Sequence, residues 1–114
     1  MRQMRAMLGP KADRVAERLR AIDPALAERV VDWAYGDVFT RPGLDLRSRE
    51  LVSVTCLTLL NLPAQLKTHL IAALNVGVSE SELRETFLHL AMFCGFPLAL
   101  AGLKVLDEVL AERQ

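Results

Sequence analysis

The chain has 114 residues, with 14 Lys and Arg side chains balanced by 14 Asp and Glu, so its formal net charge at pH 7 is zero. Hydrophobic residues make up 52% of it and charged residues 25%, a composition typical of globular proteins and unlike that of disordered ones. A chain of this size buries roughly two-thirds of its unfolded surface and folds without disulfides or a structural metal. Zero net charge argues against nucleic acid or an anionic membrane surface as a partner.

The sequence shows no pattern typical of a secretory signal, a membrane span or a disulfide framework. The basic start of the chain has no apolar stretch behind it, so we expect no secretory signal and a cytoplasmic location. The apolar run over residues 91–101 contains Gly95 and Pro97 and is too short to cross a membrane. Cys56 and Cys94 fit neither a disulfide framework nor a metal-ligand spacing, and we expect core thiols and no metal site.

Helical spacing of apolar residues recurs along the chain, whereas no segment alternates apolar and polar residues for long. The sequence therefore predicts a single all-α domain. We expect about six helices, at residues 10–21, 24–35, 46–60, 63–75, 80–94 and 97–112. Residues 36–45, with two glycines and a proline, are a connector that can carry function.

Three of these helices have informative patterns. The helix after Asp23-Pro24 carries Leu26, Val30 and Trp33 as its apolar side chains, and Ser79 begins a later helix with a capping box. The helix that contains Glu50 is apolar nearly all round beyond that residue, which indicates a central position among other helices. The last two helices offer more apolar surface than one small subunit needs, which favours self-association.

Few ionisable residues interrupt the apolar helices, and Glu50 and His69 are the most informative of them. A buried Glu and His within reach of each other form a proton relay, with Gln65 one helical turn before His69 on the same face. The alternatives are a solvated charge near a helix N-terminus for Glu50 and a surface or satisfied core residue for His69.

Other candidate site residues have two readings each. His89 is either a ligand-facing residue or an interface group. Arg41, Arg47 and Arg49 flank the connector, where an arginine either pairs with a nearby aspartate or holds a substrate carboxylate in a bidentate contact.

Five segments in this order resemble the carboxymuconolactone decarboxylase family. They cover residues 35–44 (YGDVFTRPGL), 49–52 (RELV), 66–70 (LKTHL), 73–78 (ALNVGV) and 88–97 (LHLAMFCGFP). The resemblance implies an all-helical fold like that of alkylhydroperoxidase D, assembly into homotrimers or homohexamers, and a pocket near a subunit interface around His69.

The related superfamily has two chemistries, and the sequence departs from one of them. In the alkylhydroperoxidase branch a Glu and a His equivalent to Glu50 and His69 flank a Cys-x-x-Cys motif, but Leu62 and Gln65 occupy its cysteine positions here. Without those thiols the disulfide cycle of a peroxidase does not run.

The resemblance therefore implies a decarboxylase that acts on 4-carboxymuconolactone or a related carboxylated lactone or keto acid, without metal or organic cofactor. In this interpretation His69 is the general acid, Glu50 orients it or relays its proton, and Arg41 or Arg49 contacts a carboxylate or oxyanion, with Gln65 and His89 as further substrate contacts. Two alternatives stay open. One is a peroxidase with peroxiredoxin-type activity that uses Cys56 or Cys94, and the other is an oligomer that binds a small ligand without turnover.

Overall fold

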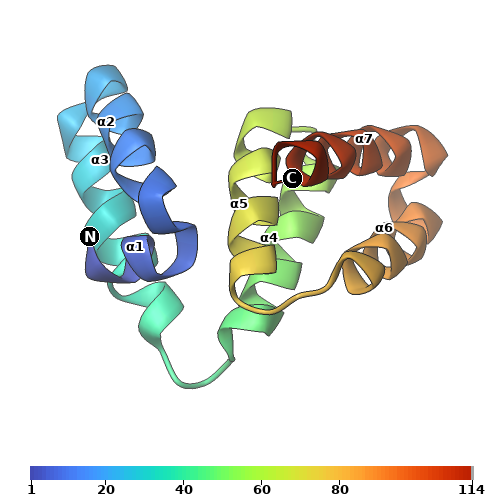
Figure 1. Cartoon of the computed structure of the whole chain (residues 1–114), viewed down its shortest axis with the longest axis horizontal. Helices are drawn as coiled ribbons and strands as arrows, with labels where there is room; N and C mark the ends of the chain where they lie inside the picture. The colour runs from blue at the N-terminus through green and yellow to red at the C-terminus, as the bar shows by residue number, and fades with distance from the viewer. Residues whose placement is uncertain (114) are drawn as a thin grey trace. The chain divides into compact units, whose positions relative to one another are not determined.

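A computed structural model describes residues 1–113 of the chain (Figure 1). These residues form seven α-helices and three short helical segments of other types, with no β-strand among them, so the all-α prediction is confirmed. The contacts within the chain divide it into two compact units, Met1–Leu46 and Arg47–Gln114. No helix in the described part has the length and hydropathy that a membrane span requires.

The first unit is built from short helices. Its elements are α1 (Arg2–Leu8), the 3₁₀ turn η1 (Gly9–Lys11), α2 (Ala12–Ile22), α3 (Pro24–Arg29), the π-helical segment η2 (Val30–Tyr35) and the 3₁₀ turn η3 (Val38–Thr40). The Asp23 carboxylate accepts a hydrogen bond from the backbone N–H of Leu26 at 2.9 Å, and Pro24 takes the first helical position. The helix thus begins where the sequence predicted. Asp23 binds a backbone N–H that has no partner within the helix, and Pro24 has no N–H that needs one.

The sequence interpretation missed helix α1. Met4, Met7 and Leu8 of this helix are all buried, and their spacing of three and four residues places them on one helical face. Seven residues are a short helix, so its stability comes from packing of this face rather than from helix propensity.

The apolar face predicted for the helix after Asp23 is wrong. Ala27, Val31 and Tyr35 are the buried residues, whereas Trp33 is 64% exposed. The shift is present before the π-helical segment, because Ala27 of α3 is buried and Leu26 is 48% exposed. Within that segment the N–H of Gly36 donates to the carbonyl of Val31 at 3.0 Å, five residues earlier. The buried residues are spaced by four, so they form one helical face, displaced by about one residue from the predicted one.

The second unit contains α4 (Leu46–Leu59), α5 (Pro63–Asn75), α6 (Glu80–Cys94) and α7 (Phe96–Arg113). The predicted capping box begins α6: Ser79 Oγ accepts from the Glu82 N–H at 3.0 Å, and the Ser79 N–H donates to Glu82 Oε1 at 2.9 Å. Gly95, with φ of 84°, separates α6 from α7 in a left-handed conformation that favours glycine.

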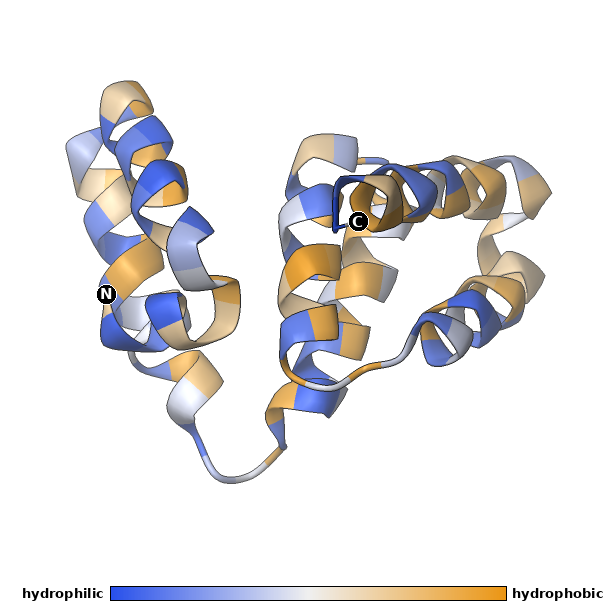
Figure 2. Cartoon of the chain, in the orientation of Figure 1, coloured by the Kyte–Doolittle hydropathy of each residue, from blue (hydrophilic) through white to orange (hydrophobic). Residues whose placement is uncertain are grey.

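Helices α6 and α7 pack closely at one position. Phe87 of α6 is fully buried, and a Cβ atom added to Gly102 of α7 would lie 2.4 Å from its ring. Only a residue without a side chain allows the two helices this approach. Figure 2 shows that both helices carry hydrophobic residues where α6 passes into α7.

Two expectations for buried residues are wrong within the single chain. Among the residues of α4, only Glu50, Val54 and Thr58 are buried, so α4 is not enclosed on every side by helices of its own chain. Cys56 is exposed and Cys94 is only half-buried, so neither is a core thiol. Cys56 lies on a face of α4 that the described part of the chain leaves exposed.

Candidate active site

Glu50 lies on the inward face of α4. Its side chain has 0% exposure, and it is spaced by four residues from Val54 and by eight from Thr58, the other buried residues of this helix. The Thr58 hydroxyl donates to the Val54 carbonyl at 2.8 Å, so this polar side chain is satisfied within its own helix. Glu50 is therefore the one buried residue of this face that bears a formal charge when ionised.

The partner of Glu50 is His69 on α5. The Nδ1 atom of His69 lies 3.0 Å from Glu50 Oε2 and 3.3 Å from Oε1, and the His69 side chain is 19% exposed. The structure thus brings together the two residues that the sequence singled out, in the buried arrangement that the relay hypothesis requires.

This geometry fixes the chemistry that the imidazole offers. When the Glu50 carboxylate is ionised it only accepts hydrogen bonds, so Nδ1–H of His69 is the donor in this contact and Nε2 is the nitrogen that Glu50 does not engage. A carboxylate removed from water is stable only with a charged or hydrogen-bonding partner. The pair is therefore suited to hold a proton on His69 and to direct Nε2 toward a substrate.

The other predicted substrate contacts lie in different places. Gln65 is exposed on α5, one turn before His69, and Arg49 is half-buried on α4 next to Glu50. Arg41 belongs to the first unit and follows η3, where its N–H donates to the Val38 carbonyl at 3.2 Å. Their roles toward a substrate stay predictions.

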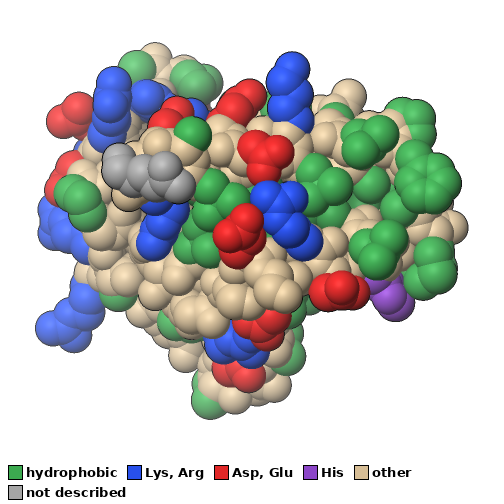
Figure 3. Space-filling view, turned by 45° about the vertical axis from the view of Figure 1, so that its right-hand side comes forward, with side chains coloured by type: hydrophobic (Ala, Val, Ile, Leu, Met, Phe, Trp, Pro, Cys, Tyr) green, Lys and Arg blue, Asp and Glu red, His purple; other side chains and the backbone are tan. Residues whose placement is uncertain are grey.

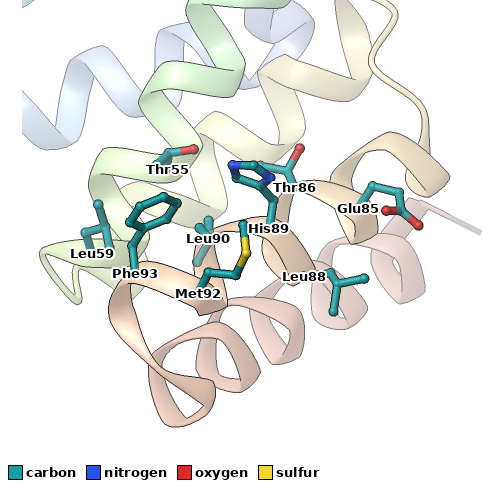
Figure 4. A pocket seen from close by; sticks show the side chains of 9 residues that line it. All are labelled: Thr55, Leu59, Glu85, Thr86, Leu88, His89, Leu90, Met92 and Phe93. Atoms are coloured by element: carbon teal, nitrogen blue, oxygen red, sulfur yellow. The ribbon is translucent and has the colours of Figure 1, made fainter.

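His89 lines a groove between α4 and α6. The groove has a volume of about 990 Å³, and Thr55 and Leu59 of α4 face His89 and Phe93 of α6 across it (Figure 4). The His89 and Phe93 rings are tilted against each other with centroids 5.9 Å apart. Neither Glu50 nor His69 lines this groove, so His89 is not part of the Glu50–His69 pair.

Apolar side chains gather around this part of the second unit (Figure 3). Phe93 is 76% exposed and Phe96 71%, and several other large apolar residues of α6 and α7 are exposed as well: Leu88, Met92 and Leu100. This is the excess of apolar surface that the sequence indicated.

Arg47 is one of the three arginines whose contacts the sequence left open. Its Nε donates to the Gly77 carbonyl at 3.3 Å, and its guanidinium forms an ion pair with Glu82. The hydrogen bond from Arg47 lowers the pKa of Glu82 to about 2, assisted by the N–H of Ser79. Because two arms of its fork bind protein groups, Arg47 is a link between α4 and the start of α6.

Residues 1–113 contain no group of three or more His, Cys, Asp or Glu side chains that could hold a metal ion.

Comparison with known proteins agrees with this arrangement. Residues 24–108, which include both Glu50 and His69, match the model of the carboxymuconolactone decarboxylase family. The chain belongs to this family.

Two relatives of this family member have names that state an activity. The chain is 34% identical over 104 residues to a 4-carboxymuconolactone decarboxylase of Acinetobacter baylyi, covering 90% of the chain and 78% of the relative. It is 35% identical over 83 residues to a nitrosuccinic acid decarboxylase of Metarhizium robertsii, covering 73% of the chain and 58% of the relative. A third relative, an uncharacterised protein of Paracoccus denitrificans, is 30% identical over 91 residues, with 78% of the chain and 68% of the relative covered.

Proposed function

We propose that the chain is a decarboxylase of small carboxylated lactones or keto acids and that His69 supplies the proton that replaces CO₂. The observation that carries this proposal is the fully buried Glu50 carboxylate hydrogen-bonded to His69 Nδ1 at 3.0 Å. Relatives named as decarboxylases of two different carboxylic acids support the reaction class.

The reaction has two steps in this proposal. In the first, the bond between the carboxylate carbon and its neighbour breaks, CO₂ leaves, and the electron pair moves into the carbonyl group of the lactone or keto acid to form an enolate. In the second, Nε2 of His69 donates its proton to the enolate carbon. The substrate's own carbonyl accepts the electrons, so the proposed route uses protein side chains alone for acid–base and electrostatic catalysis.

Glu50 holds the proton donor His69 in a fixed position. Its two oxygens lie within hydrogen-bond distance of Nδ1 and hold the ring in place, with Nε2 as the nitrogen that gives the proton to the substrate. After proton transfer, solvent returns the proton to Nε2. Glu50 thus orients the acid and does not itself touch the substrate.

The substrate carboxylate needs a cationic or polar contact that the pair does not provide. We assign this role to Arg49 or Arg41, because an arginine can hold a carboxylate or a developing oxyanion with two parallel hydrogen bonds. Gln65 and His89 are further candidate contacts, Gln65 on the helix that bears His69 and His89 in the groove between α4 and α6.

The same proposal includes a homo-oligomer, a trimer or hexamer. Exposed apolar residues such as Phe93, Phe96 and Met92 support it, because a patch of this kind on a soluble subunit is commonly an interface. Light scattering coupled to gel filtration measures the mass in solution. We expect a multiple of the 12.7 kDa chain for the wild type and a smaller species for Phe96→Glu, and a monomeric wild type would contradict the assembly.

The experiment that tests the function is a CO₂-release screen over carboxylated lactones and keto acids. Wild type is compared with His69→Ala and with Lys67→Ala, a control on the same helix whose side chain pairs with Glu112 at 2.7 Å. We expect His69→Ala to lower the rate roughly a hundredfold, as loss of a general acid typically does, with Lys67→Ala close to wild type. Equal rates for His69→Ala and wild type on every active compound would exclude His69 as the acid.

A further inference from the structure

We propose that Arg47 is a positioning residue that sets the contact between Glu50 and His69. It does so by joining the N-terminal end of α4 to the C-terminal end of α5. The inference rests on the proposed function for its kinetic consequences, but its structural part concerns the hydrogen bond between the two side chains alone.

One end of the α4–α5 pair is closed by the chain itself. The turn after α4 is tight: the Leu62 N–H donates to the Leu57 carbonyl at 3.0 Å, and Asn61 adopts a positive φ of 55°. Pro63 then begins α5. Covalent continuity therefore fixes the C-terminal end of α4 against the N-terminal end of α5.

The opposite end has no such link in sequence, and Arg47 supplies one. Arg47 lies in the first turn of α4, and its Nε donates to the carbonyl of Gly77 just beyond α5, at 3.3 Å. Figure 1 shows the segment after α5 passing beside the start of α4. The guanidinium also pairs with Glu82 in the first turn of α6.

Both partners of Arg47 are themselves held in place. The Gly77 N–H donates to the Leu74 carbonyl at 3.2 Å, so the carbonyl that Arg47 binds belongs to the C-terminal cap of α5. The Glu82 carboxylate also accepts from the Ser79 N–H at 2.9 Å. Arg47 therefore binds a backbone carbonyl and a carboxylate that a backbone N–H also holds, and the planar fork of an arginine suits this arrangement.

Glu50 follows Arg47 by three residues, less than one helical turn. A displacement of the first turn of α4 therefore moves Glu50 relative to His69 on α5. Hydrogen bonds weaken steeply as distance and angle depart from their optimum, and the pair is within this range at 3.0 Å. The position of Arg47 thus controls how firmly Glu50 holds the imidazole.

The test uses Arg47→Ala and Arg47→Lys, with Arg84→Ala as a matched control. Arg84 also pairs with two carboxylates, Glu80 at 3.1 Å and Asp107 at 2.8 Å, but it links α6 to α7 and does not touch α4 or α5. Nitrogen-15 NMR of the His69 imidazole reports the proton on Nδ1 and needs no substrate, and circular dichroism checks that each variant is folded.

We expect Arg47→Ala to move the Nδ1 resonance of His69 away from its wild-type position and to lower kcat roughly tenfold with little change in KM, because small misplacements of catalytic groups are costly. Arg47→Lys keeps the charge but not the planar fork, so its Nδ1 resonance and kcat should lie between those of wild type and Arg47→Ala. Arg84→Ala should match wild type in both the resonance and kcat. A His69 spectrum that Arg47→Ala leaves unchanged would overturn the inference.

A second variant covers the case in which Arg47→Ala does not fold. Glu82→Gln keeps an oxygen for the Ser79 N–H, so the helix start is retained, but it removes the charge that Arg47 binds. We expect the His69 Nδ1 resonance to shift in the same direction as in Arg47→Ala, but by less. A spectrum identical to that of wild type would contradict the positioning role of Arg47. If the resonance shifts and no compound releases CO₂, the positioning stands and the proposed function fails.

Discussion

Glu50 and His69 are separated by 19 residues in sequence, yet Glu50 Oε2 lies 3.0 Å from His69 Nδ1. The contact joins two helices and places a carboxylate with no solvent exposure against an imidazole that retains some. In the proposed mechanism this asymmetry separates two roles: the buried partner fixes the ring, and the partly exposed partner meets the substrate.

The close packing of Phe87 on Gly102 predicts a loss of stability on Gly102→Ala. The added methyl group would lie 2.4 Å from the ring, and the ring is fully buried, so the helices must separate. Overpacking of this kind costs about 1–3 kcal/mol, more than the gain of up to ~1 kcal/mol in helix propensity from Gly to Ala. Urea unfolding measures the difference.

Gly43→Ala is the control for this experiment. A Cβ at Gly43 meets no atom within 4 Å, and the residue is not among those with positive φ. We expect a free energy of unfolding near that of wild type. Equal stability of Gly102→Ala and Gly43→Ala would show that the α6–α7 packing is looser than described.

The Arg47–Glu82 ion pair predicts a pH dependence of stability. Arg47 and the Ser79 N–H hold the pKa of Glu82 at about 2 in the folded state, below its ordinary value of 4.5. The unfolded chain therefore binds this proton first as pH falls, so the contribution of the pair is present above about pH 4.5 and is lost progressively toward pH 2.

Glu82→Gln tests this dependence by urea unfolding between pH 7 and pH 2. The difference in stability between wild type and Glu82→Gln should narrow as the pH falls through that window, because protonated Glu82 and Gln are both neutral. A difference that stays constant over the whole range would mean that Glu82 does not titrate as described. Salt should weaken the pair, since both side chains are partly exposed.

Peroxide provides the contrast between the two chemistries of the superfamily. By the resemblance to the alkylhydroperoxidase branch, Leu62 and Gln65 occupy the expected cysteine positions, and the Cys56 thiol lies on an exposed face of α4. We expect no turnover of peroxide with a dithiol reductant, and mass spectrometry should find no disulfide between Cys56 and Cys94. Turnover that disappears in Cys56→Ser would instead favour a thiol peroxidase.

The fold could be predicted from sequence where local signals and packing agree. The Asp23-Pro24 start and the capping box at Ser79 are found where expected, because each motif satisfies backbone groups of its own helix. Helix α1 and the π segment η2 were missed. Tertiary packing decides both features, and the spacing of apolar residues alone does not predict it. Met4, Met7 and Leu8 are buried, and Val31 is buried where Trp33 was expected.

The candidate site likewise has residues that the sequence could select and contacts that it could not. Glu50 and His69 could be selected because charged and titratable residues are rare within apolar helices, and their contact then depends on how α4 and α5 pack. Arg47 could not be separated from Arg41 and Arg49, because all three flank the connector and their partners are distant in sequence. Only the coordinates show that Arg47 binds Gly77 and Glu82, 30 and 35 residues away.

The central claim is that Glu50 makes His69 the proton donor, and the rate of CO₂ release by Glu50→Gln tests it most directly. The amide has nearly the same shape as the carboxylate, but it offers Nδ1 of His69 a neutral oxygen in place of a charged one, so it holds the ring less firmly. On the compound that wild type decarboxylates fastest, we predict a fall in kcat of roughly a hundredfold in a folded protein. A Glu50→Gln enzyme with the wild-type kcat would contradict the account.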